Sequence, residues 1–248
     1  MTPVVFADLD DTLFQTARKM SEEPHPDRLA SVATNGHHSY MTAPQAAMMT
    51  WLADTTRLIP VTARSTGALG RCTLPFFDFR VAANGAVILR PDGTPDPEWT
   101  ARISNLSRTY TDTLLLFRMI ASELDGGGEL RHWTVSEFGE DIYVCIKSNT
   151  GERKLDGVER AMRRAAEQSD HGPGAFTVHR NGNNLSVTPS VISKRAAVCY
   201  LMEGLDPETP VLGMGDSLTD LPFMEACQMM IAPTGSQIHS RMKETRDA

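Results

Sequence analysis

The sequence has few of the features that mark membrane, secreted or nucleic-acid-binding proteins. No stretch approaches the roughly 20 apolar residues needed to cross a bilayer, and the opening residues MTPVVFADLD lack the basic start and long apolar run of a signal peptide. We therefore expect a cytoplasmic protein with no membrane partner. Lys and Arg number 24 against 31 Asp and Glu, and no basic run or aromatic stripe offers a face for a phosphate backbone. A nucleic-acid partner is therefore not expected.

Cysteine and histidine are scarce and scattered. The four cysteines lie far apart in apolar surroundings such as YVCIK, which favours reduced core thiols over disulfides or a zinc site. The seven histidines lack the i,i+4 spacing that places two imidazoles on one helix face. A thiolate or histidine metal centre is therefore not expected.

Apolar runs alternate with helical patterns towards both ends of the chain. Residues 3–8 and 56–62 are typical of buried strands, and residues 43–55 between them predict a helix with proline in its first turn. Strands within 210–216 and 228–233 repeat the pattern of an apolar run followed by a polar loop. Alternating strands and helices predict an α/β fold with a Rossmann-like, mostly parallel sheet.

The middle of the chain has a different order of elements. After the Pro- and Gly-rich stretch 90–99, a helix followed by two strands occurs twice. The first set is a helix over 100–124 with strands within 130–148, and the second is a helix over 155–169 with strands within 176–190. This order predicts an α+β module inserted within the α/β domain.

Acidic residues follow the first predicted strand directly. Asp8 and Asp10 are two positions apart, so they project to the same side at the carboxyl end of the strand, where open α/β sheets bind ligands. Two carboxylates held close together repel each other unless a cation lies between them or one stays protonated. Mg²⁺ suits such oxygen ligands and typically shares its remaining positions with waters and a substrate phosphate. The alternative is a solvated acidic turn followed by a threonine cap.

Three further stretches carry candidate site residues. Thr62 ends the second strand, where its hydroxyl could bind a phosphate oxygen or cap a helix. Lys194 begins an amphipathic helix, where its ammonium could balance a phosphoryl group or be a solvated surface charge. Asp216 and Asp220 follow an apolar strand and Gly215, and their spacing lets both face one side of a loop or first helical turn. The alternative for this pair is an ordinary Gly-Asp turn with a helix cap.

These four stretches, in this order, resemble the motifs of the haloacid dehalogenase-like hydrolase superfamily of aspartate-nucleophile phosphatases. The position of the inserted module and the stretch AANGAVIL are similar to the type II branch, which includes Cof-type and sucrose-phosphatase-like phosphatases with an α/β cap. The resemblance implies a catalytic core domain over 1–88 and 189–248 and an inserted α+β cap domain over 89–188. The polar stretch 18–42 lengthens the link between the first two motifs, and a flap beside the site is one candidate for its role. Within it, residues 29–42 could form a hairpin that turns at Asn35-Gly36.

The resemblance also implies a role for each candidate side chain. Asp8 would be the nucleophile and Asp10 the general acid/base. Thr62 and Lys194 would bind the phosphate. A Mg²⁺ cofactor would be held by Asp8, the backbone carbonyl of Asp10, and Asp216, with Asp220 supporting Asp216.

Of two weaker candidates for phosphate or substrate binding, one follows the strand at 56–62 and the other lies in an Asn-Gly turn that breaks the strand-like stretch 77–89. Arg64 could contact the phosphate or substrate, or form a surface salt bridge. Asn84 could bind substrate or only shape its Asn-Gly turn, and we favour the turn.

The predicted function is Mg²⁺-dependent hydrolysis of a small phosphorylated metabolite, with sugar phosphates among the candidates, through an aspartyl-phosphate intermediate. The alternatives are a phosphoryl-transfer mutase and a non-catalytic module that binds a phosphorylated metabolite. The sequence does not name the substrate, the pathway or the oligomeric state.

Overall fold

The computed structural model describes residues 1–246 and divides into two compact units. The first contains Met1–Asp96 and the chain from Ser193 onward, and the second contains Pro97–Ile192. Their assignment as a catalytic core and a cap remains a prediction.

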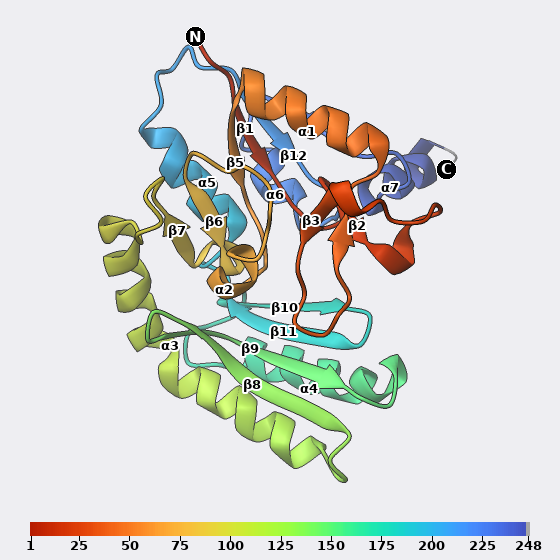
Figure 1. The fold of residues 1–248 in the computed structure, drawn as a ribbon. Coiled ribbons are helices and arrows are strands. Elements are labelled where there is room, and N and C mark those ends of the chain that lie inside the picture. The colour runs from red at the N-terminus through yellow and green to blue at the C-terminus, as the bar shows by residue number, and fades with distance from the viewer. Residues whose placement is uncertain (247–248) are drawn as a thin grey trace. The chain divides into compact units, whose positions relative to one another are not determined.

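A four-stranded parallel sheet forms the centre of the first unit. Its strands are β1 (Val4–Ala7), β5 (Arg57–Pro60), β12 (Val211–Met214) and β13 (Met229–Ile231), in the order β13-β12-β1-β5. Figure 1 labels β1, β5 and β12. All pairings in this sheet are parallel. The four side chains of β1 are buried because this strand has a neighbour on each side and is covered on both faces. The predicted α/β fold with a parallel sheet is confirmed.

Capped helices accompany these strands. The helix α1 (Ala43–Thr55) begins with a capping box in which Thr42 and Gln45 exchange side-chain to backbone hydrogen bonds, and its residues match the predicted helix. The helix α5 (Lys194–Glu203) begins at Ser193, whose side chain accepts a hydrogen bond from the backbone of Ala196. The other helices of this unit are α2 (Thr66–Leu69), α6 (Leu221–Met224) and α7 (Gln237–Arg246).

A small antiparallel sheet occupies the link between β1 and α1. Its strands are β2 (Gln15–Thr16), β3 (Leu29–Ser31) and β4 (Ser39–Tyr40), in the order β2-β4-β3. Two 3-10 turns, Ala17–Lys19 and Pro26–Arg28, lie between β2 and β3. We call Gln15–Tyr40 the insert. The antiparallel pairing of β3 with β4 confirms the hairpin predicted around Asn35-Gly36.

A second hairpin contacts the start of α5. Its strands are β6 (Arg80–Ala82) and β7 (Val87–Leu89), and its turn contains Ala83, Asn84 and Gly85, all with positive φ. A Cβ atom at Gly85 would overlap the carbonyl group of Ser193 and lie 2.9 Å from the backbone nitrogen of Lys194. Glycine is required here by both its φ of +96° and this close approach.

The second unit is an antiparallel sheet with two helices on one face. The strands β8 (Leu130–Glu137), β9 (Glu140–Ser148), β10 (Phe176–Asn181) and β11 (Asn184–Pro189) have the order β10-β11-β9-β8. The helices are α3 (Pro97–Leu124) and α4 (Leu155–Glu167) (Figure 1). Alternate residues of β9, such as Val144 and Ile146, join both helices in one apolar core. The predicted repeat of helix, strand and strand is confirmed.

None of the helices within residues 1–246 combines the length and apolar character that crossing a membrane requires. All four cysteines are free thiols and partly buried.

Gly85→Ala tests the contact between the β6–β7 turn and α5. We expect it to lower the free energy of unfolding by about 3 kcal/mol. The new methyl group would push the β6–β7 turn away from the backbone at the start of α5, and alanine is strained at the positive φ of this position. Gly36→Ala is the matched control, since Gly36 also has positive φ (+77°) but a Cβ there would meet no atom within 4 Å. Its expected cost is about 1 kcal/mol. Urea unfolding of both variants measures the difference, and equal losses would contradict the proposed contact.

Candidate active site

The carboxyl ends of three parallel strands bring the main candidate residues together. Asp8 follows β1, Thr62 follows β5 and Asp216 follows β12. Parallel strands end at the same edge of the sheet, and the backbone N–H of Asp8 extends the pairing by donating to the carbonyl of Met214 at 2.9 Å. The edge is therefore where the sequence predicts a ligand site.

Three carboxylates form a compact cluster at this edge. One oxygen from each of Asp8, Asp216 and Asp220 lies within 4.8 Å of the others. Asp8 is 6% exposed and Asp220 1% exposed, so water screens their repulsion poorly. Gly215 permits this arrangement, because a Cβ there would lie 2.6 Å from the Cβ of Asp220. The cluster needs a compensating positive charge.

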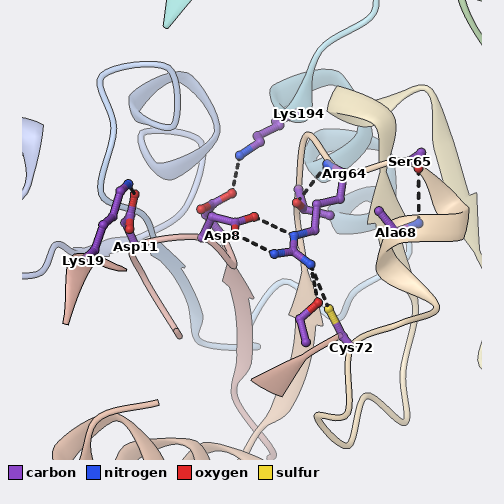
Figure 2. Close-up of polar contacts among 11 residues, drawn as sticks. Asp8, Asp11, Lys19, Arg64, Ser65, Ala68, Cys72 and Lys194 are labelled. Atoms are coloured by element: carbon purple, nitrogen blue, oxygen red, sulfur yellow. Dashed lines mark hydrogen bonds and ion pairs between the residues drawn. The ribbon is translucent and has the colours of Figure 1, made fainter. Parts of the chain in front are cut away.

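Lys194 supplies one such charge from the first turn of α5. Its Nζ donates to Oδ1 of Asp8 and to Oδ1 of Asp220, each at 2.6 Å (the Asp8 bond is drawn in Figure 2). Burial lowers the pKa of Lys194, but the two carboxylates outweigh this effect and raise the pKa above its ordinary value. The side chain is therefore a protonated donor that bridges two members of the cluster.

One ammonium does not balance three carboxylates. Burial raises the pKa of Asp8 despite the opposing attraction of Lys194, and the charge of Asp220 raises it further. Burial also raises the pKa of Asp216 to about 6, with repulsion from Asp220 and Asp11 adding to the effect. These oxygens are the hard ligands that Mg²⁺ prefers, and a divalent cation would offset both the burial of these carboxylates and their mutual repulsion. The donor set fits a Mg²⁺ site.

The loop after β12 orients Asp220 in detail. Oδ2 of Asp220 accepts hydrogen bonds from the backbone N–H of Ser217 at 3.1 Å and from its hydroxyl at 2.7 Å. Asp220 immediately precedes α6. It therefore lies at the end of a loop that leads into a helix, as the sequence predicted. Sequence reasoning did not identify Ser217, although it lies within the same motif stretch.

Arg64 forms a bidentate ion pair with Asp10. Its Nε donates to Oδ2 of Asp10 and its Nη2 donates to Oδ1, both at 2.7 Å. The Arg64 side chain is 19% exposed, whereas that of Asp10 is 45% exposed. The partner is thus the predicted proton shuttle and not an unrelated surface carboxylate. Binding of phosphate or substrate by Arg64 remains a prediction.

Asn84 and Thr62 are linked through their backbones. The N–H of Asn84 donates to the carbonyl of Thr62 at 3.0 Å, and Asn84 has a φ of 57°. The hydroxyl of Thr62, which is 1% exposed, accepts from the backbone N–H of Arg64 at 3.1 Å. This geometry agrees with the turn interpretation of Asn84. A substrate contact by Asn84 and phosphate binding by Thr62 are still predictions.

The insert contributes residues that sequence reasoning missed. Lys19 forms an ion pair with Asp11, and the hydroxyl of Ser31 accepts a hydrogen bond from Nη1 of Arg64 at 2.6 Å. Asp11 has a φ of 63°, which is uncommon for a residue other than glycine. The polar composition of the insert was a signal that it lies near the site, but its contacts could not be read from sequence spacing.

An open cavity of about 760 Å³ adjoins the cluster on the Asp216 side. The start of α1 and the loop after β13 form its walls, and hydroxyl and amide side chains such as Thr12, Gln45 and Gln237 line it. The hydroxyl of Thr12 is buried and has no hydrogen-bond partner among the described residues. The first unit thus has room for a small polar molecule beside the carboxylates.

The raised pKa values predict how the stability of the metal-free protein depends on pH. A carboxyl group with a higher pKa in the folded state binds more protons there than in the unfolded chain, so stability falls as pH rises between about 4 and 7. Asp216→Asn should reduce this fall by on the order of 1 kcal/mol, allowing for solvent screening. Thermal unfolding in chelator at pH 5 and pH 8 measures it. A variant with an unchanged pH dependence would contradict the cluster.

The fold is similar to that of several solved phosphatases and hydrolases. No family model matches the chain, and no curated protein matches its sequence. A trehalose-6-phosphate phosphatase of Aspergillus fumigatus is 15% identical with a TM-score of 0.53, covering 93% of this chain and 81% of that one. A haloacid dehalogenase-like hydrolase from B. subtilis is 15% identical with a TM-score of 0.53, covering 96% and 92%. A phosphatase of the same superfamily from Bacteroides thetaiotaomicron is 13% identical with a TM-score of 0.53, covering 98% and 95%. The chain has the fold of the haloacid dehalogenase-like hydrolases.

Proposed function

We propose that this protein is a Mg²⁺-dependent phosphatase that hydrolyses a small phosphorylated metabolite through an aspartyl-phosphate intermediate. The observation that carries the proposal is the cluster of Asp8, Asp216 and Asp220, two of which Lys194 bridges, with Asp10 two residues beyond the nucleophile candidate. The shared fold with phosphatases of the haloacid dehalogenase superfamily supports it.

In the first step, Asp8 attacks the phosphorus of the substrate. A bond forms between its carboxylate oxygen and phosphorus, while the ester bond to the leaving oxygen breaks and that oxygen takes a proton from Asp10. Lys194 and Thr62 bind the other phosphoryl oxygens and stabilise their charge. The ammonium of Lys194 already lies 2.6 Å from Asp8, so it is placed beside the attacking group.

In the second step, water hydrolyses the acyl phosphate. Asp10, now ionised, accepts a proton from the water as its oxygen bonds to phosphorus, and the bond from phosphorus to Asp8 breaks. Phosphate leaves, Asp8 returns as a carboxylate and Asp10 is again protonated. This route replaces direct attack of water on the substrate ester by two easier steps.

The metal would be held by Asp8, Asp216 and the backbone carbonyl of Asp10, with Asp220 supporting the loop. When bound, Mg²⁺ would neutralise these carboxylates and stabilise negative charge on the phosphoryl group. Gly215 and Ser217 keep the loop that carries Asp216 in place through the contacts described above.

We assign the substrate to the class of small phosphate esters and favour sugar phosphates. A relative by fold is named as a trehalose-6-phosphate phosphatase. The cavity beside Asp216 is lined by several hydroxyl and amide groups, which can pair with the hydroxyls of a polar metabolite.

Metal removal tests the cofactor. Excess chelator should abolish phosphate release from 4-nitrophenyl phosphate and Mg²⁺ should restore it, because the carboxylates would otherwise repel the incoming phosphoryl group. Asp216→Asn should raise the Mg²⁺ concentration needed for half-maximal activity by about tenfold or more. Full activity in excess chelator would show that the metal assignment is wrong.

Substitution of the two carboxylates after β1 separates their roles. Asp10→Asn should lower turnover by about 10²–10⁴-fold and allow covalent phosphate to accumulate on Asp8, because water is no longer deprotonated in the second step. The good leaving group of 4-nitrophenyl phosphate lets the first step continue. Rapid quenching followed by mass spectrometry of the peptide containing both residues locates the phosphate.

The Asp8→Asn variant is the control for that experiment. It lacks the attacking carboxylate, so it should form no phosphoenzyme and release no phosphate. The label trapped in Asp10→Asn should be lost on treatment with hydroxylamine, which cleaves acyl phosphates. Phosphate on a serine or histidine, or undiminished turnover by Asp8→Asn, would refute the mechanism.

A further inference from the structure

The insert holds the Asp10–Asp11 turn from two sides. Lys19 pairs with Asp11 on one side. On the other side, Ser31 accepts a hydrogen bond from Arg64, which in turn holds both carboxylate oxygens of Asp10. Figure 2 shows the Lys19–Asp11 pair and the Arg64 guanidinium on opposite sides of Asp8.

Ser31 lies at a fixed and buried position. It is 3% exposed, pairs with Ser39 across the small sheet, and forms an isolated bridge with Cys72 on its other side. Its hydroxyl lies 2.6 Å from Nη1 of Arg64. The acceptor of this hydrogen bond is therefore a buried hydroxyl whose backbone is held by strand pairing.

The guanidinium of Arg64 is held at each of its nitrogens. Nε and Nη2 are bound to Asp10, and Nη1 is bound to Ser31 and lies 3.8 Å from the sulfur of Cys72. The group also stacks on Phe14, with 5.0 Å between Cζ and the ring centroid. A planar fork held in this way fixes the plane of the carboxylate that it binds.

Asp10 depends on the guanidinium of Arg64 for its orientation. Its side chain is 45% exposed, and its hydrogen bonds among the described residues are those to Arg64. A half-exposed carboxylate without a second partner would otherwise sample several rotamers. Proton transfer requires the donor to be within hydrogen-bond reach of the leaving oxygen, so loss of orientation costs rate.

We propose that Ser31 is a positioning residue that acts through Arg64 to hold the Asp10 carboxylate in place for proton transfer. The proposal rests on the proposed phosphatase function, because it assigns Asp10 the proton shuttle. It gives the insert a role in catalysis: β3 provides the fixed point from which Asp10 is oriented.

Leaving-group dependence tests the role of Ser31. Phenyl phosphate has a poor leaving group that needs a proton, whereas 4-nitrophenyl phosphate has a good one. Ser31→Ala should lower kcat/KM, which reports the first step, about tenfold on phenyl phosphate and about twofold or less on 4-nitrophenyl phosphate. Ser31→Thr keeps the hydroxyl and should recover most of the loss.

Two controls separate positioning from a general loss of structure. Ser39→Ala removes an equally buried hydroxyl (3% exposed) from the opposite position in the same sheet, and should leave both rates unchanged. In an Asp10→Asn background, Ser31→Ala should cause no further selective loss on phenyl phosphate, because the group it positions is gone. Equal losses of kcat/KM on both esters, or the same selective loss in Ser39→Ala, would overturn the positioning role.

An NMR measurement that does not depend on catalysis tests the contact between Ser31 and Arg64 directly. In ¹⁵N NMR spectra of the arginine side chains, the guanidinium of Arg64 should rotate slowly about its Cζ–Nη bonds in the wild type and faster in Ser31→Ala. Unchanged rotation would refute the contact. If the wild type releases no phosphate from either ester, the proposed function and the catalytic part of this role are wrong, and the Arg64 spectrum alone then decides whether Ser31 holds the guanidinium.

Discussion

Repulsion among buried carboxylates is the constraint on which the rest of the site depends. Asp8, Asp216 and Asp220 place oxygens within 4.8 Å of one another at the edge of a parallel sheet. Lys194 bridges two of them, and burial, with repulsion from neighbouring carboxylates adding to it, raises the pKa values of Asp8 and Asp216. Such a cluster is electrostatically unfavourable by itself, and a divalent cation would relieve the repulsion within it.

Close backbone packing keeps these charges in their places. Gly85 lets the β6–β7 turn contact the start of α5, and so locates Lys194. Gly215 lets the loop after β12 turn tightly against Asp220. Neither glycine carries a reactive group, but each removes a Cβ that would push a charged side chain away. The site is therefore sensitive to substitutions that leave its charges untouched.

The insert adds a second set of contacts to this edge. Lys19 and Ser31 reach the Asp10–Asp11 turn from opposite sides, the first directly and the second through Arg64. The reactive carboxylates are thus supported from two directions: Asp8 by Lys194 from α5, and Asp10 by Arg64 and the small sheet. This division separates charge compensation at the nucleophile from orientation of the proton shuttle.

The sequence by itself determined the order of elements and the residues that meet at the sheet edge. Period and turn residues locate α1, the β3–β4 hairpin and the repeated helix, strand and strand, because these are local patterns of burial and backbone geometry. Asp8, Thr62 and Asp216 could be grouped because parallel strands end at one edge. Tertiary structure alone decided that Arg64 pairs with Asp10 and that Ser31 holds Arg64, since these partners are 54 and 33 positions apart and no periodicity relates them.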